Sequence, residues 1–411
     1  MNRPNILLVF SDQEQSLSRS PLLSLPHRQR LMDRGVTFDR CYCTTPQCSA
    51  SRASIMTGRY PQQVGVVTNI GAVGSRALSP DVPTLGSVFR EAGYETQYMG
   101  KWHLGNEDGS LDQFGFPGRI RARGEDLADR AAGWLARPPS EPWLLVVSFV
   151  NPHDVYSMPP EHPTRPGVSL PDSFGDDLHA KPPPQLRFLE HDQGVAVHGF
   201  GEEDWLRYIS WYYDLIERVD GHLGVILDAL ESSGQHQDTL VAYTSDHGDM
   251  AGGHGMPFKG PFMYEELLRV PLVVRWPDGA GAGNTCDRLA SLIDLAPTFA
   301  AAAGLRWPTE LPGLDLRAMA EDGGAPWRDR IFAQYHSKQR WSNPIRTVRT
   351  ERWKYNHYLE DRDELYDLQE DPFEMRNEIH TPQHQDLIAK LRAYLDEWRR
   401  DTADPLAHAD A

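Results

Sequence analysis

Short apolar runs alternate with longer segments of helical periodicity through the first two thirds of the chain. Apolar residues recur at spacings of three and four in residues 84–92, 126–136 and 205–230. The apolar, β-rich runs, each bounded by polar or turn residues, are 5–10, 143–150, 239–244 and 271–276. Continuous apolar strands separated by helices are typical of a parallel sheet with both faces covered. We therefore predict an α/β fold with a large, mostly parallel sheet sandwiched by helices.

The pattern changes near residue 327. Residues 345–350, 353–359 and 364–367 have the composition of short antiparallel strands with charged turns, and residues 385–398 have that of an amphipathic helix. We predict an α/β domain over residues 1–326 and a C-terminal α+β subdomain over residues 327–411. The Pro- and Gly-rich stretches 158–173 and 181–185 predict a long loop excursion, and such loops often form rims or lids.

Polar residues follow three of the predicted strands directly. In a largely parallel sheet, ligands lie beyond the carboxyl ends of the strands, so residues 11–13, 151–154 and 245–249 should lie near one another. The carboxylates of Asp12 and Asp246, with the imidazole of His247, indicate a site for a hard cation. A single Asp after a strand is more often a cap or turn residue. Two at matching strand ends favour metal binding.

Composition and charge exclude several classes of protein. Of 411 residues, 40% are hydrophobic and 10% aromatic, which is enough for a sizeable core and argues against disorder. The formal charge of −17 repels nucleic acid and anionic membranes, so we expect neither as a partner. Any anion site must therefore be a local cluster of cations.

The first apolar run is short, and we interpret it as a buried strand and not as a signal peptide. No run reaches the roughly 20 apolar residues that span a bilayer. The expected location is cytoplasmic, or periplasmic if a leader has been removed.

Three of the four cysteines, Cys41, Cys43 and Cys48, cluster in the sequence. The ordinary interpretation is a group of buried, reduced thiols. A zinc site is an alternative, but the spacings are not the paired ones of structural zinc sites and no fourth ligand lies nearby. Cys48 needs other evidence before it can be assigned a catalytic role.

That evidence is the motif around Cys48. Residues 48–52 read Cys-Ser-Ala-Ser-Arg and residues 57–59 read Thr-Gly-Arg. This pattern resembles the signature of the formylglycine-dependent sulfatases, in the alkaline phosphatase-like superfamily, although Ala50 stands where that signature usually has Pro. In that family a generating enzyme oxidises the Cys to formylglycine. One hydroxyl of its hydrate attacks sulfur, and loss of the proton from the other then expels sulfate.

The resemblance extends to the predicted cation site. In sulfatases the first strand commonly ends in Asp-Asp and a later strand in Asp-Asn or Asp-His, and the matching pairs here are Asp12-Gln13 and Asp246-His247. The resemblance implies a metal held by these four residues and by the modified Cys48. Oxygen ligands favour Ca²⁺, and the imidazole of His247 leaves Mn²⁺ open. Gln13 replaces a carboxylate and lowers the negative charge of the site.

Further segments match the sulfate-binding residues of the family. Residues 100–105 read Gly-Lys-Trp-His-Leu-Gly, and in an extended segment the side chains of Lys101 and His103 would point the same way. Residues 151–154 read Asn-Pro-His-Asp, and residues 257–260 read Pro-Phe-Lys-Gly. Cations and imidazole donors can hold sulfate oxygens and offset charge on the leaving group. The resemblance implies a catalytic set of Cys48, Arg52, Lys101, His103, His153 and Lys259.

The leading hypothesis is a sulfatase that hydrolyses a small-molecule or saccharide sulfate ester, with a formylglycine-generating enzyme as its maturation partner. The alternative in the same superfamily is a phosphonate monoester hydrolase or phosphodiesterase, which uses the same formylglycine. The Lys101 and His103 pair favours sulfate, which has three peripheral oxygens. A silent binder of sulfated ligands is a further alternative, and it requires Cys48 to stay a thiol.

The sequence does not identify the ester. Residues that could form the rim of the site, or could equally be surface packing, are Asn69, His254, His336, Arg340 and Trp341.

Overall fold

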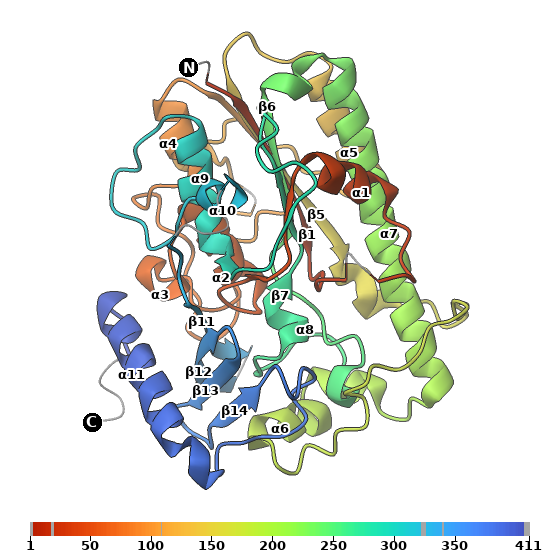
Figure 1. Cartoon of the computed structure of the whole chain (residues 1–411). Helices are drawn as coiled ribbons and strands as arrows, with labels where there is room; N and C mark the ends of the chain where they lie inside the picture. The colour runs from red at the N-terminus through yellow and green to blue at the C-terminus, as the bar shows by residue number, and fades with distance from the viewer. Residues whose placement is uncertain (1–2, 18–19, 108, 322–325, 339–340, 407–411) are drawn as a thin grey trace.

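The computed structural model describes residues 3–17, 20–107, 109–321, 326–338 and 341–406. Within these ranges the main sheet has the strand order β4-β5-β1-β6-β8-β2-β9, and its first four strands are parallel (Figure 1). These parallel strands are β4 (Glu95–Gly100), β5 (Trp143–Pro152), β1 (Asn5–Asp12) and β6 (Thr239–Ser245). The predicted parallel sheet is confirmed, and its carboxyl ends lie at one edge.

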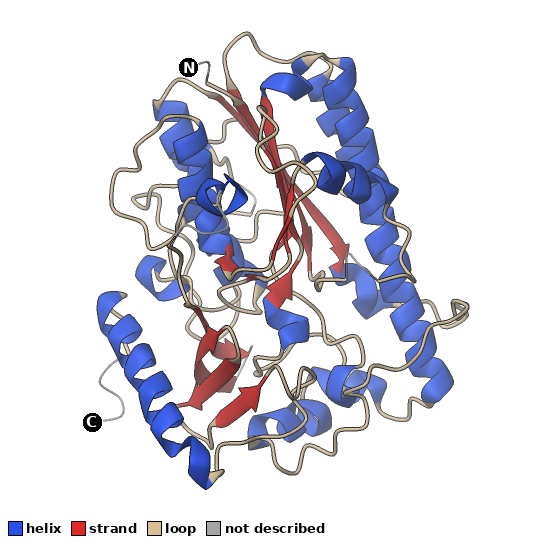
Figure 2. Cartoon of the chain, viewed as in Figure 1, coloured by secondary structure: helices blue, strands red, loops and turns tan. Residues whose placement is uncertain are grey.

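Helices cover both faces of this sheet, as Figure 2 shows. Leu7 and Val9 of β1 pack on one face with residues of α1 (Pro26–Arg34), α5 (Gly124–Leu135) and α7 (Glu202–Ser232). The alternate residues of β1, Ile6 and Leu8 among them, pack on the other face with α2 (Cys48–Thr57), α4 (Leu85–Glu91) and α9 (Leu295–Ala302). Since every residue of β1 is buried, the strand is a continuous apolar run in the sequence.

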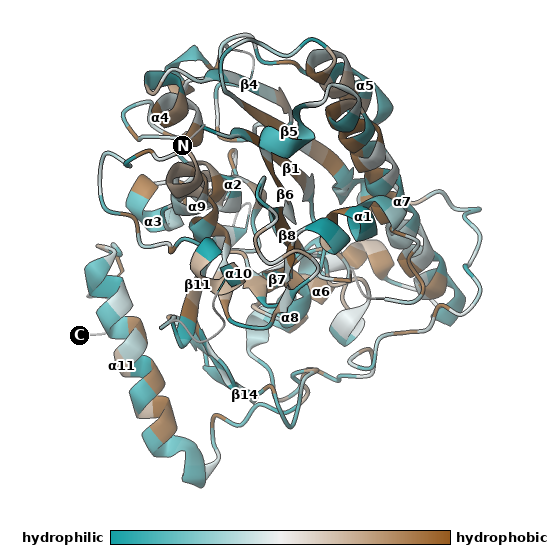
Figure 3. Cartoon of the chain, turned by 45° about the horizontal axis from the view of Figure 1, so that its top comes forward, coloured by the Kyte–Doolittle hydropathy of each residue, from teal (hydrophilic) through white to brown (hydrophobic). Residues whose placement is uncertain are grey.

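Hydropathy follows the same layers. In Figure 3 the central strands are largely brown, whereas α1 is mostly teal on the outside of the molecule. Among the described residues, no helix combines the length and the apolar character needed to cross a membrane.

Antiparallel strands complete the far edge of the sheet. β8 (Leu272–Arg275) runs antiparallel to β6, β2 (Val36–Phe38) runs antiparallel to β8, and β9 (Thr285–Cys286) follows at the edge. A small sheet of β10 (Ala290–Ser291), β3 (Cys41–Tyr42) and β7 (Arg269–Val270) leads the chain towards the start of α2.

An antiparallel sheet and a helix form the C-terminal part of the described chain. The sheet has the order β11 (Arg330–Lys338), β12 (Trp341–Thr350), β13 (Trp353–Tyr358) and β14 (Glu364–Asp367). Helix α11 (Gln385–Asp401) packs on it through a core that includes Leu391, Val348 and Tyr355. These elements confirm the predicted small antiparallel sheet and helix. The division of the chain into two domains at residue 327 stays a prediction.

The excursion between β5 and α7 is partly helical. It contains η2 (His153–Ser157), α6 (Pro183–His191) and η3 (Gln193–Val197), so the prediction of loop over residues 181–185 is wrong where α6 begins. Pro at the start of α6 suits a helix because the first helical N–H needs no partner within the helix. The shorter helices elsewhere are α3 (Pro61–Val64), η1 (Asp112–Phe114), η4 (Gln235–Asp238), η5 (Gly253–Gly255), α8 (Glu265–Leu268), η6 (Leu292–Asp294), α10 (Arg317–Glu321) and η7 (Pro382–His384).

Candidate active site

The carboxyl ends of β1 and β6 place two carboxylates side by side. Asp12 is the last residue of β1 and Asp246 follows β6, and both are fully buried. Their proximity is visible in the contacts of Gln13, whose backbone N–H donates to Asp246 Oδ1 at 3.0 Å. Gln13 lies at a positive φ of 75°, so the chain turns sharply here and keeps the strand end close to its neighbour.

Arg52 holds these two carboxylates together. Its Nε lies 2.8 Å from Asp246 Oδ2, and its Nη2 lies 2.7 Å from Asp12 Oδ2. Its Nη1 donates to the Lys101 carbonyl and to Ser148 Oγ, both at 2.7 Å. The guanidinium thus joins α2 to the middle of β5 and to the ends of β1, β4 and β6. Arg52 lies one helical turn after Cys48 on α2, so both side chains face the same site.

The pKa values of the two carboxyl groups are shifted in opposite directions. Burial acts to raise the pKa of Asp12, but Lys101 and Arg52 outweigh it and hold that pKa well below its usual range. The pKa of Asp246 is raised, by burial first and then by the charge of Asp12. Lys101 Nζ reaches Asp12 Oδ2 at 2.5 Å, which explains why Asp12 is the more acidic of the two.

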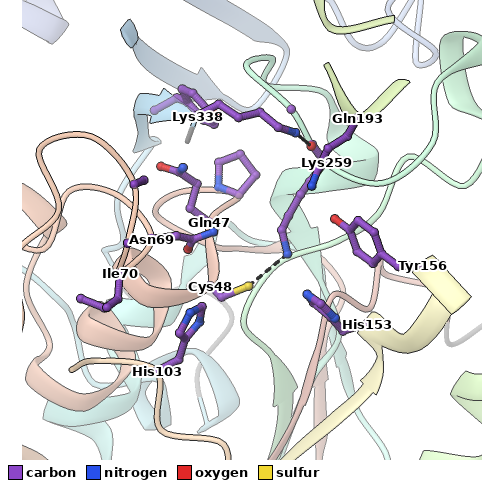
Figure 4. A pocket seen from close by; sticks show the side chains of 15 residues that line it. Gln47, Cys48, Asn69, Ile70, His103, His153, Tyr156, Gln193, Lys259 and Lys338 are labelled. Carbon is purple, nitrogen blue, oxygen red and sulfur yellow. Dashed lines mark hydrogen bonds between the residues drawn. The ribbon is translucent and has the colours of Figure 1, made fainter. Parts of the chain in front are cut away.

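Cys48 opens α2 and points at this charged cluster. Its Sγ lies 3.0 Å from Lys259 Nζ, 3.2 Å from His247 Nε2 and 3.6 Å from Asp12 Oδ1. Figure 4 shows the thiol below the ammonium of Lys259. Burial and Asp12 act to raise the thiol pKa, but Lys101, Lys259 and His247 outweigh them and leave it well below the usual value. The environment of position 48 therefore favours negative charge on this side chain.

Metal ligands are also available at this position. One atom each from Asp12, Cys48, Asp246 and His247 lies within 4.8 Å of the others, and all four residues are buried. Carboxylate oxygens with an imidazole suit a divalent cation.

The ammonium of Lys259 lies among three of the predicted metal ligands. Lys259 Nζ is held by Gln13 Oε1 at 2.6 Å, by Cys48 Sγ and by His247 Nε2 at 3.1 Å. Gln13, His247 and Cys48 thus each place an acceptor atom beside the same ammonium group. Acceptor atoms that converge in this way also fit a metal ion. The Gln13 amide is shared, since its Nε2 donates to Asp249 Oδ2 at 2.6 Å.

Cys41 and Cys43, the other cysteines of the cluster, lie in the hydrophobic core and are not among the metal-binding group. All four cysteines of the chain are free thiols, as predicted. A zinc site on Cys41, Cys43 and Cys48 has no support from the described residues.

The thiol lies at the base of a cavity of about 590 Å³. His103, His153 and Lys259 lie on its wall around Cys48 (Figure 4). Lys101 and His103 line a second cavity of about 430 Å³ that adjoins the first, because His103, His153 and Tyr156 belong to both. The structure therefore brings every predicted catalytic residue to one site. Their individual roles stay predictions.

The expected extended path from Lys101 to His103 is wrong. His103 has a φ of 60°, in the left-handed region, so the segment turns after Trp102. Trp102 is fully buried among aromatic rings, and this packing fixes the turn. The two polar side chains still reach the same site, by a turn and not by strand alternation.

The environment of His153 favours the uncharged form of its imidazole. Burial, with the nearby cations Lys259 and Lys101, lowers its pKa to about 3 against the opposing effect of Asp12. A neutral imidazole has one N–H donor and one acceptor nitrogen, so it can donate to an anionic oxygen without adding charge.

Several residues of the cavity lie outside every motif recognised in the sequence. They come from separate elements: Gln47 before α2, Tyr156 in η2, Gln193 in η3, and Tyr335 and Lys338 in β11. No short motif contains them, and only the docking of β11 against the loops of the main sheet brings the last two to the site.

The residues predicted to form the rim do not all line the cavity. Asn69 lines the cavity, and its Oδ1 accepts from the Ser49 N–H at 3.0 Å. His254 is buried and contacts Asp176 at 2.7 Å, away from the cavity lining. His336 and Trp341 do not line the cavity either, and Arg187 lies 4.1 Å above the Trp341 ring. Arg340 lies outside the described residues.

Comparison with family models and curated proteins gives a consistent result. The model described as Sulfatase matches residues 4–305, and the model described as N-sulphoglucosamine sulphohydrolase, C-terminal, matches residues 252–401. The chain is 30% identical over 433 residues to the Delta 4,5-hexuronate-2-O-sulfatase of Bacteroides thetaiotaomicron, covering 96% of this chain and 89% of that protein.

Solved structures share the fold along nearly the whole chain. A 2-O GAG sulfatase has a TM-score of 0.83 and 26% identity, covering 98% of this chain and 93% of that one. The phosphonate monoester hydrolase of Agrobacterium radiobacter also has a TM-score of 0.83, with 24% identity and coverage of 97% and 96%. The expected sulfatase-like fold is confirmed.

Proposed function

Since the chain belongs to the sulfatase family of sulfuric ester hydrolases, we propose that it cleaves the sulfate monoester of a saccharide through formylglycine at position 48. The observation that carries the proposal is the surroundings of Cys48. Its side chain meets Asp12, His247 and Lys259 within 3.6 Å, at the base of a cavity large enough for a sugar ring.

The modified residue and a metal ion would provide the reactive centre. Formylglycine supplies a hydrated aldehyde whose hydroxyls serve in turn as nucleophile and as the group that expels sulfate. A divalent metal ion held by Asp12, Gln13, Asp246 and His247 supplies positive charge beside the nucleophile. We propose Ca²⁺, since the oxygen ligands outnumber the imidazole, with Mn²⁺ as the second choice.

The cations of the site bind the transferred sulfate. Lys101 contacts Asp12 and Lys259 contacts Cys48, so both ammonium groups lie beside the proposed nucleophile. Their charges offset the charge on the peripheral oxygens as the ester bond breaks. His103 and His153, on the shared wall of the two cavities, donate to the leaving oxygen or to sulfate. Arg52 acts differently, because its guanidinium donates to Asp12, Asp246, the Lys101 carbonyl and Ser148 and so holds the two carboxylates in position.

The saccharide part of the proposal rests on the relatives. The 30% identical protein is named for a hexuronate sulfate, and another relative, at 26% identity over 98% of this chain, is named N-acetylglucosamine-6-O-sulfatase. The cavity beyond Cys48 is lined by polar side chains such as Gln47, Asn69 and Gln193, which suit the hydroxyl groups of a sugar.

The alternative is hydrolysis of a phosphonate monoester. It is favoured by the similarity of fold to the phosphonate monoester hydrolases, although a likeness at 24% identity shows the fold alone. Two groups beyond the metal site, Lys101 and His103, suit the three free oxygens of sulfate better than a phosphonate that carries an organic substituent.

A direct comparison of substrates tests the choice. We expect kcat/KM for 4-nitrophenyl sulfate to exceed that for the 4-nitrophenyl ester of phenylphosphonate by at least about tenfold. The protein is first shown by mass spectrometry to carry formylglycine at position 48. A preference for the phosphonate would overturn the proposal, and an unmodified thiol in protein from the native host, with tight binding of a sulfated sugar, would favour a silent binder.

A further inference from the structure

Lys338 is a buried cation on the wall of the catalytic cavity that the proposed chemistry does not use. It is the last residue of β11, and its exposed fraction is 6%. In Figure 4 its side chain extends from the C-terminal sheet across the far side of the cavity from Cys48. The C-terminal sheet therefore contributes a positive charge to the part of the cavity that lies beyond the sulfate-binding groups.

The contacts of this ammonium leave its charge without a carboxylate at contact distance. Among the described residues its Nζ donates to the Lys259 carbonyl and lies 4.3 Å from the centroid of the Phe188 ring. Asp192 acts on it only at longer range. Burial first, and then Lys259, lower the pKa of Lys338 to about 7 in spite of Asp192. A buried cation held by a carbonyl and a ring alone is costly until an anion joins it.

Lys259 gives the spacing between this cation and the nucleophile. The ammonium of Lys259 contacts Cys48 Sγ at 3.0 Å, and the backbone carbonyl of the same residue accepts from Lys338. The two ends of one lysine thus mark two positions, one at the side chain of position 48 and one at Lys338. They are about one lysine side chain apart, a span that fits two substituents of a single sugar ring.

We propose that Lys338 is a specificity-determining residue that binds a carboxylate on the sugar whose sulfate is removed, so that the substrate is a sulfated uronic acid. This inference rests on the proposed sulfatase function and names its substrate class.

The number of donors distinguishes a carboxylate from a second sulfate. Around Cys48 the transferred sulfate has two lysines and two histidines available, whereas the far wall, among the residues that the structure describes, offers one ammonium beside Gln193 and Tyr335. One ammonium with neutral neighbours suits the two oxygens of a carboxylate. The sugar carboxylate and Lys338 would form an ion pair, so that each buried charge has an opposite charge as partner.

The test uses a matched pair of substrates that differ only at C6. The methyl glycosides of 2-O- and 3-O-sulfated glucuronate carry a carboxylate there, and the equally sulfated glucosides carry an alcohol. We expect the wild-type protein to prefer the uronates. Lys338→Met should reduce the ratio of the two kcat/KM values by about 10- to 100-fold, mainly through KM for the uronate, since a hydrogen-bonded charge pair is lost.

Two variants control for other causes. Lys338→Arg keeps the charge and should retain most of the preference. Lys390→Met removes an exposed lysine on α11 and should leave the ratio unchanged. The readout is the ratio of two kcat/KM values measured on the same protein. A loss of folded or formylglycine-bearing protein lowers both values equally and leaves their ratio unchanged.

Each outcome decides the matter. A wild-type ratio near one, an equal loss on both sugars, or turnover of 4-nitrophenyl sulfate with neither sugar accepted would overturn the role of Lys338 and leave the sulfatase function standing. If formylglycine-bearing protein cleaves no sulfate at all, the proposed function fails instead. Calorimetry would then give the Kd of each substrate of the pair for the wild-type and Lys338→Met proteins. The ratio of the two Kd values then tests the role of Lys338 in place of the ratio of kcat/KM values.

Discussion

At the scale of single residues, the motif around Cys48 identifies the reactive position and the partners of the family pattern. The motif does not show which hydrogen-bond partners these residues have. The Gln13 amide accepts from Lys259 and donates to Asp249, a division that depends on the ends of β1 and β6 and on the loop between η5 and α8. Lys338 is hidden for the same reason. A lysine at the end of a strand is ordinarily solvated, and its burial depends on how the C-terminal sheet docks.

The metal site gives the first prediction. Asp246→Asn keeps the shape of the side chain and removes a charged ligand, so the affinity for Ca²⁺ should fall at least about tenfold, as even indirect partners of a metal ligand contribute that much. Metal content after dialysis measures it. Asp278→Asn, at an exposed carboxylate paired with Arg317, is the control and should bind metal normally. Full metal retention in Asp246→Asn would exclude Asp246 as a ligand.

The buried charge of Lys338 predicts a dependence of stability on pH. Folding lowers its pKa from 10.5 to about 7, so the folded state binds fewer protons and loses stability as the pH falls from about 10 to 7. Lys338→Met removes this loss. The variant should therefore have a larger free energy of unfolding than wild type at pH 7 without substrate, by up to about 4 kcal/mol as measured by urea unfolding.

The sign of that difference is informative. The gap in unfolding free energy between the two proteins should narrow as the pH rises from 7 to 9.5, because the cost of removing the Lys338 proton on folding falls as the pH approaches the unfolded pKa of 10.5. A variant that is less stable than wild type at pH 7 would show that the ammonium already has a compensating partner.

At the scale of elements, the segment after β4 depends on close packing with β5. Gly100 has a φ of 95°, and a Cβ at this position would lie 2.1 Å from the Ser148 carbonyl oxygen. Ser148 also accepts from Arg52 through its Oγ. The glycine thus sets the path of Lys101 and of the turn at His103. The expectation of an extended segment failed here because alternation of side chains carries no information on positive φ.

A pair of glycine variants isolates this contact. Gly93→Ala meets no atom within 4 Å but has a φ of 84°, so it should cost about 1 to 2 kcal/mol from backbone strain alone. Gly100→Ala adds the clash with Ser148 and should cost at least about 2 kcal/mol more, with a loss of aryl sulfate turnover. Urea unfolding and turnover check both. Equal effects of the two variants would show that the close approach to Ser148 does not hold the segment.

At the scale of the whole molecule, the apolar periodicity is sufficient to predict the layers. Buried strands such as β1 and the long amphipathic helix α7 have strong local signals. β11 has a weak signal, because polar residues that include Gln334 and Ser337 are buried in it through contacts distant in sequence. The missed strand is also the one that carries Tyr335 and Lys338 into the cavity, so the error in the fold explains the omission in the site.

A buried lysine of the C-terminal sheet pairs with a carboxylate of α8 and with another that follows β14. Lys354 on β13 is fully buried and lies 3.1 Å from Glu265 on α8 and 2.6 Å from Glu374. Lys354→Met leaves two buried carboxylates without this partner and should cost about 3 to 5 kcal/mol in urea unfolding. Lys390→Met on the surface should change stability by less than about 0.5 kcal/mol. A small cost for Lys354→Met would show that the docking does not depend on these pairs.

The claim that position 48 is the nucleophile of a sulfate ester hydrolase is tested most directly by turnover of 4-nitrophenyl sulfate in wild type and in Cys48→Ala. Both proteins are produced with a formylglycine-generating enzyme and loaded with Ca²⁺. The account predicts a fall in kcat of at least about 10⁴-fold in a variant that keeps its unfolding transition, as for removal of other enzymatic nucleophiles. Turnover by Cys48→Ala at the wild-type rate would contradict it.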